Sequence, residues 1–145
     1  MVCVLSLVGR ILLAALFIAA GVDHVQNFDS VVADFNQHEI FSCDVLLEQE
    51  LFVENREVIM QGLVGFALFL QIAGGLLVVL NCRIGYLMLI AFTVPVTYVH
   101  HAFWESATPE ADMIHFMKNV ALVGALLALF AAGCGASTCT AAPAP

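Results

Sequence analysis

Apolar residues fall into four long stretches separated by polar segments. The stretches cover about residues 2–22, 58–80, 84–101 and 113–133. A helix needs about 20 largely apolar residues to cross the hydrocarbon of a membrane. The alternating polarity of a membrane β-barrel is absent from the sequence. The pattern therefore predicts an all-α fold, a membrane four-helix bundle that forms a single membrane domain over residues 1–145.

Arg10 and Pro95 bear on what is expected of the first and third apolar stretches. Arg10 lies inside the first apolar stretch, whereas a signal peptide carries its positive charge ahead of its apolar segment. The first stretch is therefore expected to be a true first helix. Pro95 lies inside the third stretch, where it removes an amide donor and frees the carbonyl of Ala91, so a kink is expected there.

The connection over residues 23–57 contains a short amphipathic segment. Its apolar residues recur at helical spacing: Phe28, Val31, Val32 and Phe35. We expect a short surface helix, capped by Asn27 or Asp29, with these side chains turned to membrane or protein. A second apolar set predicts another helical piece before the second span: Val45, Leu46, Leu47, Leu51 and Phe52.

Small residues recur in several spans. The fourth span has them four residues apart, at Gly124, Ala128 and Ala132, flanked by Ala121 and Ala125. The other sets are Gly62 with Gly65, the pair Gly74–Gly75, and Ala15 with Ala19. Small residues let helix backbones approach closely in lipid. We therefore expect these positions to face neighbouring helices.

Composition excludes several classes of protein. Apolar residues make up 62% of the chain and charged residues 11%, against about 45–50% and 25% in soluble domains. A soluble enzyme and a disordered region are excluded. Twelve acidic residues against four basic ones exclude a nucleic-acid binder, because a phosphate backbone would be repelled.

The distribution of charged residues along the chain bears on the topology in the membrane. The acidic residues, all twelve of them, lie in the connections 23–57 and 100–112, on one side of the membrane. Basic residues are divided evenly between the sides, so the positive-inside rule favours neither orientation. We expect the acid-free side, with both termini and the small-residue tail 134–145, to face the cytoplasm or matrix.

Polar side chains gather at the edge of the bundle beside the acidic connections. The candidate ligand-binding residues are His24, His100, His101, His115, Lys118 and Asn119. His115 and Asn119 share a helical face with Asp112, and Thr93 and Thr97 form a matching stripe. Adjacent histidines lie about 100° apart on a helix, so one of the pair is expected to point inward and to cluster with His24 and His115.

Three interpretations of this edge remain open. A quinone headgroup could bind there with its tail in lipid. The histidines could instead be interfacial anchors, like Trp104 and Tyr98. A metal site is the third interpretation, but no spacing matches a standard ligand pattern, so no metal is expected. No catalytic residue is identified.

The cysteines give a weak signal. Four lie on the terminal side, at Cys3, Cys82, Cys134 and Cys139, and Cys43 lies on the acidic side. No C-x-x-C motif is present. Cys134 and Cys139 are close enough in sequence for a disulfide, although a free structural thiol is the commoner case.

The order of several motifs resembles the DoxX family of small four-helix membrane proteins. The matching segments are Gly9–Arg10, Phe17–Gly21, Leu70–Leu77, Arg83, His100 or His101 with Phe103–Trp104, and His115–Gly124. The resemblance implies association with membrane redox complexes and a candidate quinone ligand. This chain has His24 where that family usually has Lys, and Gln71 where it usually has Glu, so an acid–base pair is replaced.

We therefore expect an accessory subunit that stabilises a larger electron-transfer complex of respiratory or photosynthetic type. It would not be catalytic alone and would hold no cofactor of its own. The alternative is a quinone-linked oxidoreductase subunit, of the thiosulfate:quinone type, that binds a quinone headgroup at the histidine edge. Expected partners are other membrane subunits and lipids, in a bacterial inner membrane or an organelle inner membrane. A transporter would need paired broken helices in an internal repeat, and the sequence shows none.

Overall fold

The computed structural model describes residues 2–37, 55–104 and 108–133. Within them the chain forms helices and no strand: α1 (Val2–Gln26), α2 (Phe28–Gln37), α5 (Arg56–Val79), α6 (Arg83–His100) and α7 (Pro109–Gly133). The predicted all-α fold is confirmed. The second apolar set of the first connection, Cys43, Cys134 and Cys139 lie outside the described residues.

Four of these helices, α1, α5, α6 and α7, are long and apolar enough to cross a membrane. This is compatible with a multi-pass membrane protein. The largest differences from the predicted bounds are the longer end of α1 and the earlier start of α7. Pro109 occupies the first position of α7, and Glu110 and Asp112 follow in its first turn. Proline and carboxylates both favour the start of a helix, so α7 begins before its apolar stretch.

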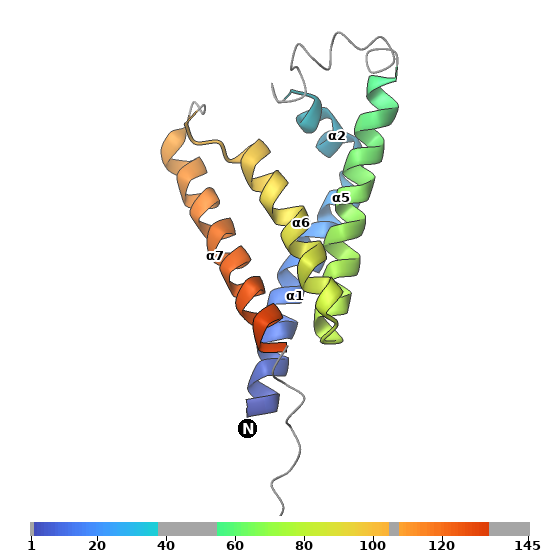
Figure 1. Ribbon diagram of the computed structural model, residues 1–145. Coiled ribbons are helices and arrows are strands. Elements are labelled where there is room, and N and C mark those ends of the chain that lie inside the picture. The colour runs from blue at the N-terminus through green and yellow to red at the C-terminus, as the bar shows by residue number, and fades with distance from the viewer. Residues whose placement is uncertain (1, 38–54, 105–107, 134–145) are drawn as a thin grey trace, which may run out of the picture.

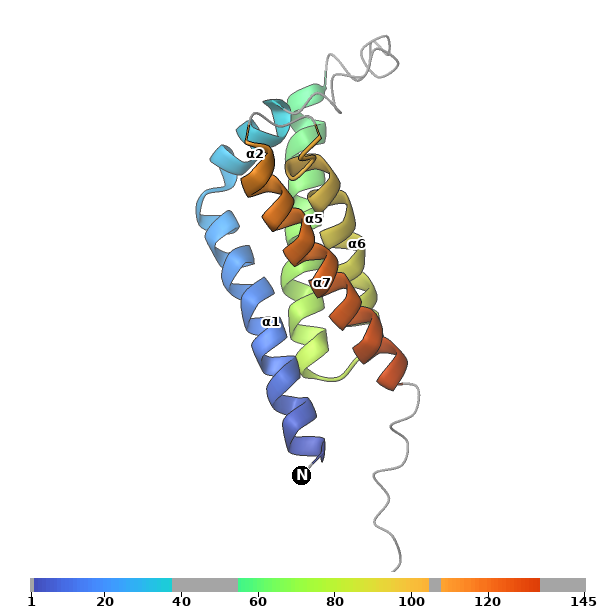
Figure 2. The ribbon, with the colours of Figure 1, turned by 90° about the vertical axis from the view of Figure 1, so that its left-hand side faces the viewer.

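The long helices pack in the order α1–α5–α6–α7, so α5 and α6 are the inner helices. α5 packs against α1 and α6, and α6 packs against α7 (Figure 1). In the most apolar window of each helix, 33% of α5 is buried but only 6% of α7. A view turned by 90° shows that α1 begins and α7 ends at the same end of the molecule (Figure 2). α7 is therefore a peripheral helix, held mainly by α6.

A tight link joins α5 to α6. Asn81 adopts the left-handed conformation, with φ 58°, which asparagine tolerates better than most residues. The Cys82 amide donates to the Leu77 carbonyl at 2.9 Å, and the Asn81 amide donates to the Val78 carbonyl at 3.0 Å. These two hydrogen bonds form a Schellman motif, which ends α5 and reverses the chain within a few residues.

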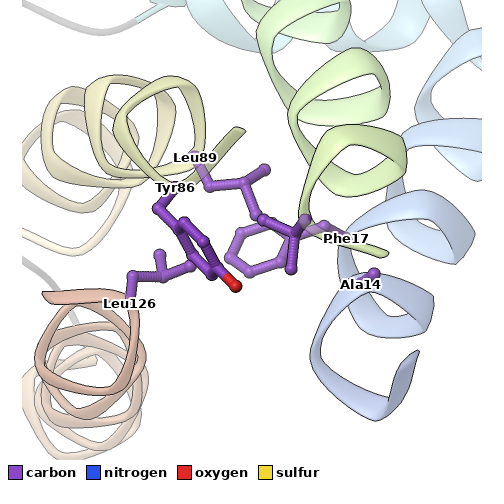
Figure 3. Packing of buried hydrophobic residues seen from close by; sticks show 6 residues of the cluster. Ala14, Phe17, Tyr86, Leu89 and Leu126 are labelled. Carbon is purple, nitrogen blue, oxygen red and sulfur yellow. The ribbon is translucent and has the colours of Figure 1, made fainter. Parts of the chain in front are cut away.

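A shared apolar core joins the four long helices. Its buried residues are Ala14 and Phe17 from α1, Val78 from α5, Tyr86 and Leu89 from α6, and Leu126 from α7. Tyr86 and Leu126 meet beside Phe17 in the close view (Figure 3). The Phe17 ring also packs edge-on against Phe92, with 6.4 Å between the ring centroids.

Glycines allow the closest helix contacts. A Cβ added at Gly85 would lie 2.7 Å from the Leu77 Cβ and 2.8 Å from the Gly74 carbonyl oxygen. A Cβ added at Gly75 would lie 2.9 Å from the Ile18 Cγ1. α6 and α1 thus pack directly on the Gly74–Gly75 segment of α5, as predicted.

The small-residue stripe of α7 does not pack as predicted. Gly124, Ala128 and Ala132 are all exposed, and a Cβ added at Gly124 would meet no described atom within 4 Å. Leu126, two residues further on, is fully buried. Two residues are about 200° of helical rotation, so the stripe lies on the opposite side of α7 from the core.

Other small positions also fail the packing prediction. Ala15 and Ala19 are exposed on α1. Gly62 and Gly65 of α5 would meet no described atom within 4 Å if a Cβ were added. Bulky side chains, rather than these small ones, define the faces turned toward the core.

The predicted surface helix is α2, which lies on α5. Its apolar face packs through Phe28, Val31, Val32 and Phe35 against Met60, Val64 and Leu68. The prediction that this face is turned away from water is confirmed. The Asn27 Nδ2 donates to the Asp23 carbonyl at 3.0 Å, so the Asn27 side chain closes the end of α1 instead of capping α2.

α6 continues through Pro95 to His100. Thr93 and Thr97 are buried on one face, and their hydroxyls donate to the Leu89 carbonyl at 2.7 Å and the Thr93 carbonyl at 2.6 Å. Both hydroxyls are thus satisfied within α6. A bend at Pro95 stays a prediction.

Candidate functional site

A cavity of about 420 Å³ lies where α2 crosses the ends of α1, α5 and α6. Its polar lining comprises His24, Ser30, Asp34, His100 and His101. Its apolar lining includes Val64, Leu68, Phe92 and Val96. We call this space the histidine cavity. Its mixture of apolar walls and a few convergent polar groups is typical of sites for small amphiphilic ligands.

His100 ties the end of α6 to α2. Its Nδ1 lies 3.2 Å from the Asp34 Oδ2, and its ring meets the Phe35 ring edge-on at 4.4 Å between centroids. The His100 side chain is 18% exposed and that of Asp34 is 61% exposed. A carboxylate that accepts from Nδ1–H fixes the tautomer, so Nε2 carries the lone pair in the neutral ring.

His101 has a similar arrangement on the other side. Its Nδ1 lies 3.5 Å from the Asp112 Oδ1, and its ring stacks on His115 at 5.1 Å between centroids. His101 follows the last helical residue, with φ −127° and ψ 36°. Both His100 and His101 therefore line the cavity, contrary to the expectation that only one would point inward. The 100° rule applies within a helix, and α6 ends between the two residues.

The remaining candidate residues line a different space. His115, Lys118 and Asn119 border a hollow of about 460 Å³ between α1 and α7, together with Leu16, Ala121 and Leu122. We call it the α1–α7 groove. The structure therefore places His24, His100 and His101 in one site and His115 in an adjoining one, with the His101–His115 stack as the contact between them.

Aromatic rings cover the end of α6 and the first turns of α7. Trp104 lies 5.8 Å from Tyr98, 5.1 Å from Phe103 and 6.0 Å from Phe116 between ring centroids. Tyr98 and Trp104 are about half exposed. This arrangement fits interfacial anchoring at the depth of lipid headgroups, one of the three interpretations of this edge.

One buried polar group, Gln71, was noted in the sequence only as a departure from the DoxX pattern and was not included among the candidate site residues. Gln71 is 2% exposed near the middle of α5, and its Oε1 has no hydrogen-bond partner among the described residues. A lone amide inside an apolar span was the available signal, because such a group is costly in lipid. No group of three or more His, Cys, Asp and Glu residues in the described part of the chain could hold a metal ion.

Comparison with known proteins corrects the family assignment. The resemblance to DoxX proteins is wrong, because residues 2–132 match a family model described as HR-like lesion-inducing. Two of the segments that suggested DoxX, Phe17–Gly21 and Leu70–Leu77, are short, apolar and contain small residues, and close helix packing in lipid favours such segments generally. No curated protein and no solved structure matches the chain. Since the match covers most of its length, the chain belongs to the HR-like lesion-inducing family.

Proposed function

We propose that the chain is a non-catalytic subunit that stabilises a larger membrane assembly. The observation that carries this proposal is the outward small-residue face of α7, formed by Gly124, Ala128 and Ala132. All three are exposed, and the space around Gly124 is free of described atoms within 4 Å. Small residues at this spacing let a second helix backbone approach closely.

Exposed apolar area alone would not support this proposal. Leu127 of α7 and Phe66 of α5 are also exposed, as expected for side chains that contact lipid tails. Helix association in lipid depends on close packing rather than on burial of apolar area. The small-residue face therefore favours a protein partner, whereas the bulky exposed residues are equally suited to lipid.

The type of assembly needs separate support. The expectation of an electron-transfer complex came with the DoxX resemblance, and the family assignment removes that basis. The histidine cavity provides a second basis for an electron-transfer complex, since a quinone headgroup could occupy it. A bacterial or organelle inner membrane, where quinone-linked assemblies operate, is the location that goes with this proposal.

A quinone-linked subunit is accordingly the second candidate function. His100 and His101 each direct Nδ1 toward a carboxylate, which leaves Nε2 as an acceptor in the neutral ring. The hydroxyl of a reduced quinone could donate a hydrogen bond to such a nitrogen. The bound quinone would carry the electrons, and the apolar walls of the histidine cavity would hold the quinone ring.

Co-purification tests the first candidate. Gly124→Leu should reduce recovery of partner subunits at least tenfold, because the added side chain occupies the face that a partner helix would use. Gly62→Leu is the matched control, since Gly62 is an exposed helical glycine that also has open space around it. Equal recovery of partners with both variants would refute the proposal.

A further inference from the structure

The α1–α7 groove contains polar side chains without polar partners. Lys118 and His115 are exposed and Asn119 is half-buried. Among the described residues, none of the three makes an ion pair or a side-chain hydrogen bond. An ammonium group within a membrane span is costly unless an anion or water meets it. The groove is therefore suited to a ligand with acceptor oxygens.

The depth of Lys118 suits a lipid phosphate. It lies nine residues after Pro109, about 14 Å along the helix axis. α7 has 25 residues, so it is about 37 Å long and exceeds a hydrocarbon layer of about 30 Å. Lys118 thus starts below the headgroup level, and its flexible stem can extend upward toward it. His115 lies one turn closer to the surface on the same side.

The walls of the groove suit an acyl chain. Leu16 of α1 and Ala121 and Leu122 of α7 are apolar. The extensive packing of α1 is with α5, and that of α7 is with α6. The groove therefore opens between two spans, where a phospholipid can enter from the surrounding bilayer.

α1 carries a carboxylate nearer to the same membrane surface. Asp23 follows Leu16 by seven residues on α1, so it shares its face and lies about 10 Å nearer the membrane surface. Asp23 is exposed, and its Oδ1 accepts from Asn27 at 3.3 Å. A carboxylate at the rim attracts an amine and disfavours a second anionic group.

We propose that the α1–α7 groove binds a zwitterionic phospholipid, with its phosphate at Lys118 and His115 and its amine at Asp23. Charge-assisted hydrogen bonds from the ammonium and imidazole groups hold the phosphate oxygens. The six acidic residues that the structure describes lie at this end of the long helices or on α2, at Asp23, Asp29, Asp34, Glu57, Glu110 and Asp112. Their charge favours a zwitterionic headgroup over an anionic one. This site is separate from the histidine cavity and from the small-residue face of α7.

Lipid retention measures the interaction directly. The full chain is reconstituted with equal amounts of phosphatidylethanolamine and phosphatidylglycerol of identical acyl chains, and the retained lipids are counted by native mass spectrometry. We expect phosphatidylethanolamine to be retained preferentially. Lys118→Gln should lower its retention about tenfold, the loss expected for one charge-assisted hydrogen bond. Arg83→Gln, which removes an exposed charge at the other end of the bundle, is the matched control.

Asp23→Asn tests the amine contact separately. This variant should still retain phospholipid but should lose the preference for phosphatidylethanolamine. Lys118→Arg should retain lipid as the unmodified chain does, and circular dichroism checks that each variant is folded. Retention by Lys118→Gln equal to that of Arg83→Gln would overturn the proposal. A preference for phosphatidylglycerol in the unmodified chain, or an unchanged preference in Asp23→Asn, would also overturn it.

Discussion

Replacing Gly85 with alanine should separate α6 from α5. The new Cβ would lie 2.8 Å from both the Gly74 carbonyl oxygen and the Val78 amide nitrogen. Both are backbone atoms of α5, so neither can rotate away. To restore an ordinary contact of 3.4 Å, α6 must retreat by about 0.6 Å. That movement would loosen the buried residues Tyr86 and Leu89 on the same helix.

The loss of folding stability caused by Gly85→Ala can be estimated by comparison with Gly124→Ala. Alanine is favoured over glycine in a helix interior by about 1 kcal/mol. This gain applies in full at Gly124 but not at Gly85, which lies in the first turn of α6. A Cβ at Gly124 meets no described atom within 4 Å, so that variant of the isolated chain should be slightly stabilised. The clash at Gly85 should cost about 1–3 kcal/mol, so Gly85→Ala should be less stable than Gly124→Ala.

Equilibrium unfolding in mixed micelles measures this difference. Circular dichroism follows the helices, and Trp104, the single tryptophan of the chain, reports by fluorescence on the contact between α6 and α7. If the two variants unfold within about 0.5 kcal/mol of each other, the usual range for a surface substitution, the close approach of α5 and α6 is refuted.

Two further predictions concern polar groups. Gln71→Leu should stabilise the isolated chain by about 1–3 kcal/mol in the same unfolding assay, because it removes a buried oxygen without a described partner; a loss of stability would show that Gln71 has a polar partner. For the proposed quinone-linked function, His100→Gln should lower quinone-linked turnover of the proposed assembly about tenfold and leave the assembly intact. This is the loss expected for one hydrogen bond at the reacting group. Reduced assembly with unchanged turnover per complex would instead assign His100 a structural role.

The sequence predicts the spans well because their signal is local. Twenty apolar residues need a membrane wherever they occur, and the start of α7 was misplaced only because Pro109 and the acids after it favour an earlier helix start. The faces of the spans are harder to predict. In a membrane, a small residue such as Gly124 can face either a neighbouring helix or the lipid. The buried side of α7 is the one that carries the bulky Leu126.

The candidate site shows the same limit. Its residues were identified because ionisable groups are rare in apolar spans. Their grouping depended on where α6 ends, since His101 leaves the helix and joins His100 in the cavity. It also depended on the separation of α1 from α7, which gives His115 and Lys118 a groove of their own. Neither the helix end nor the separation is encoded in residue spacing.

The short link between α5 and α6 has a consequence for how the protein is made. Contacts between neighbouring segments form fastest because little chain entropy is lost in bringing them together. α5 and α6 leave the ribosome consecutively, and the Schellman motif at Asn81 reverses the chain between them. They are expected to enter the membrane as a paired hairpin, on which the other long helices then pack. α1 then docks on the α5 side and α7 on the α6 side, so α7 joins last and separates most easily.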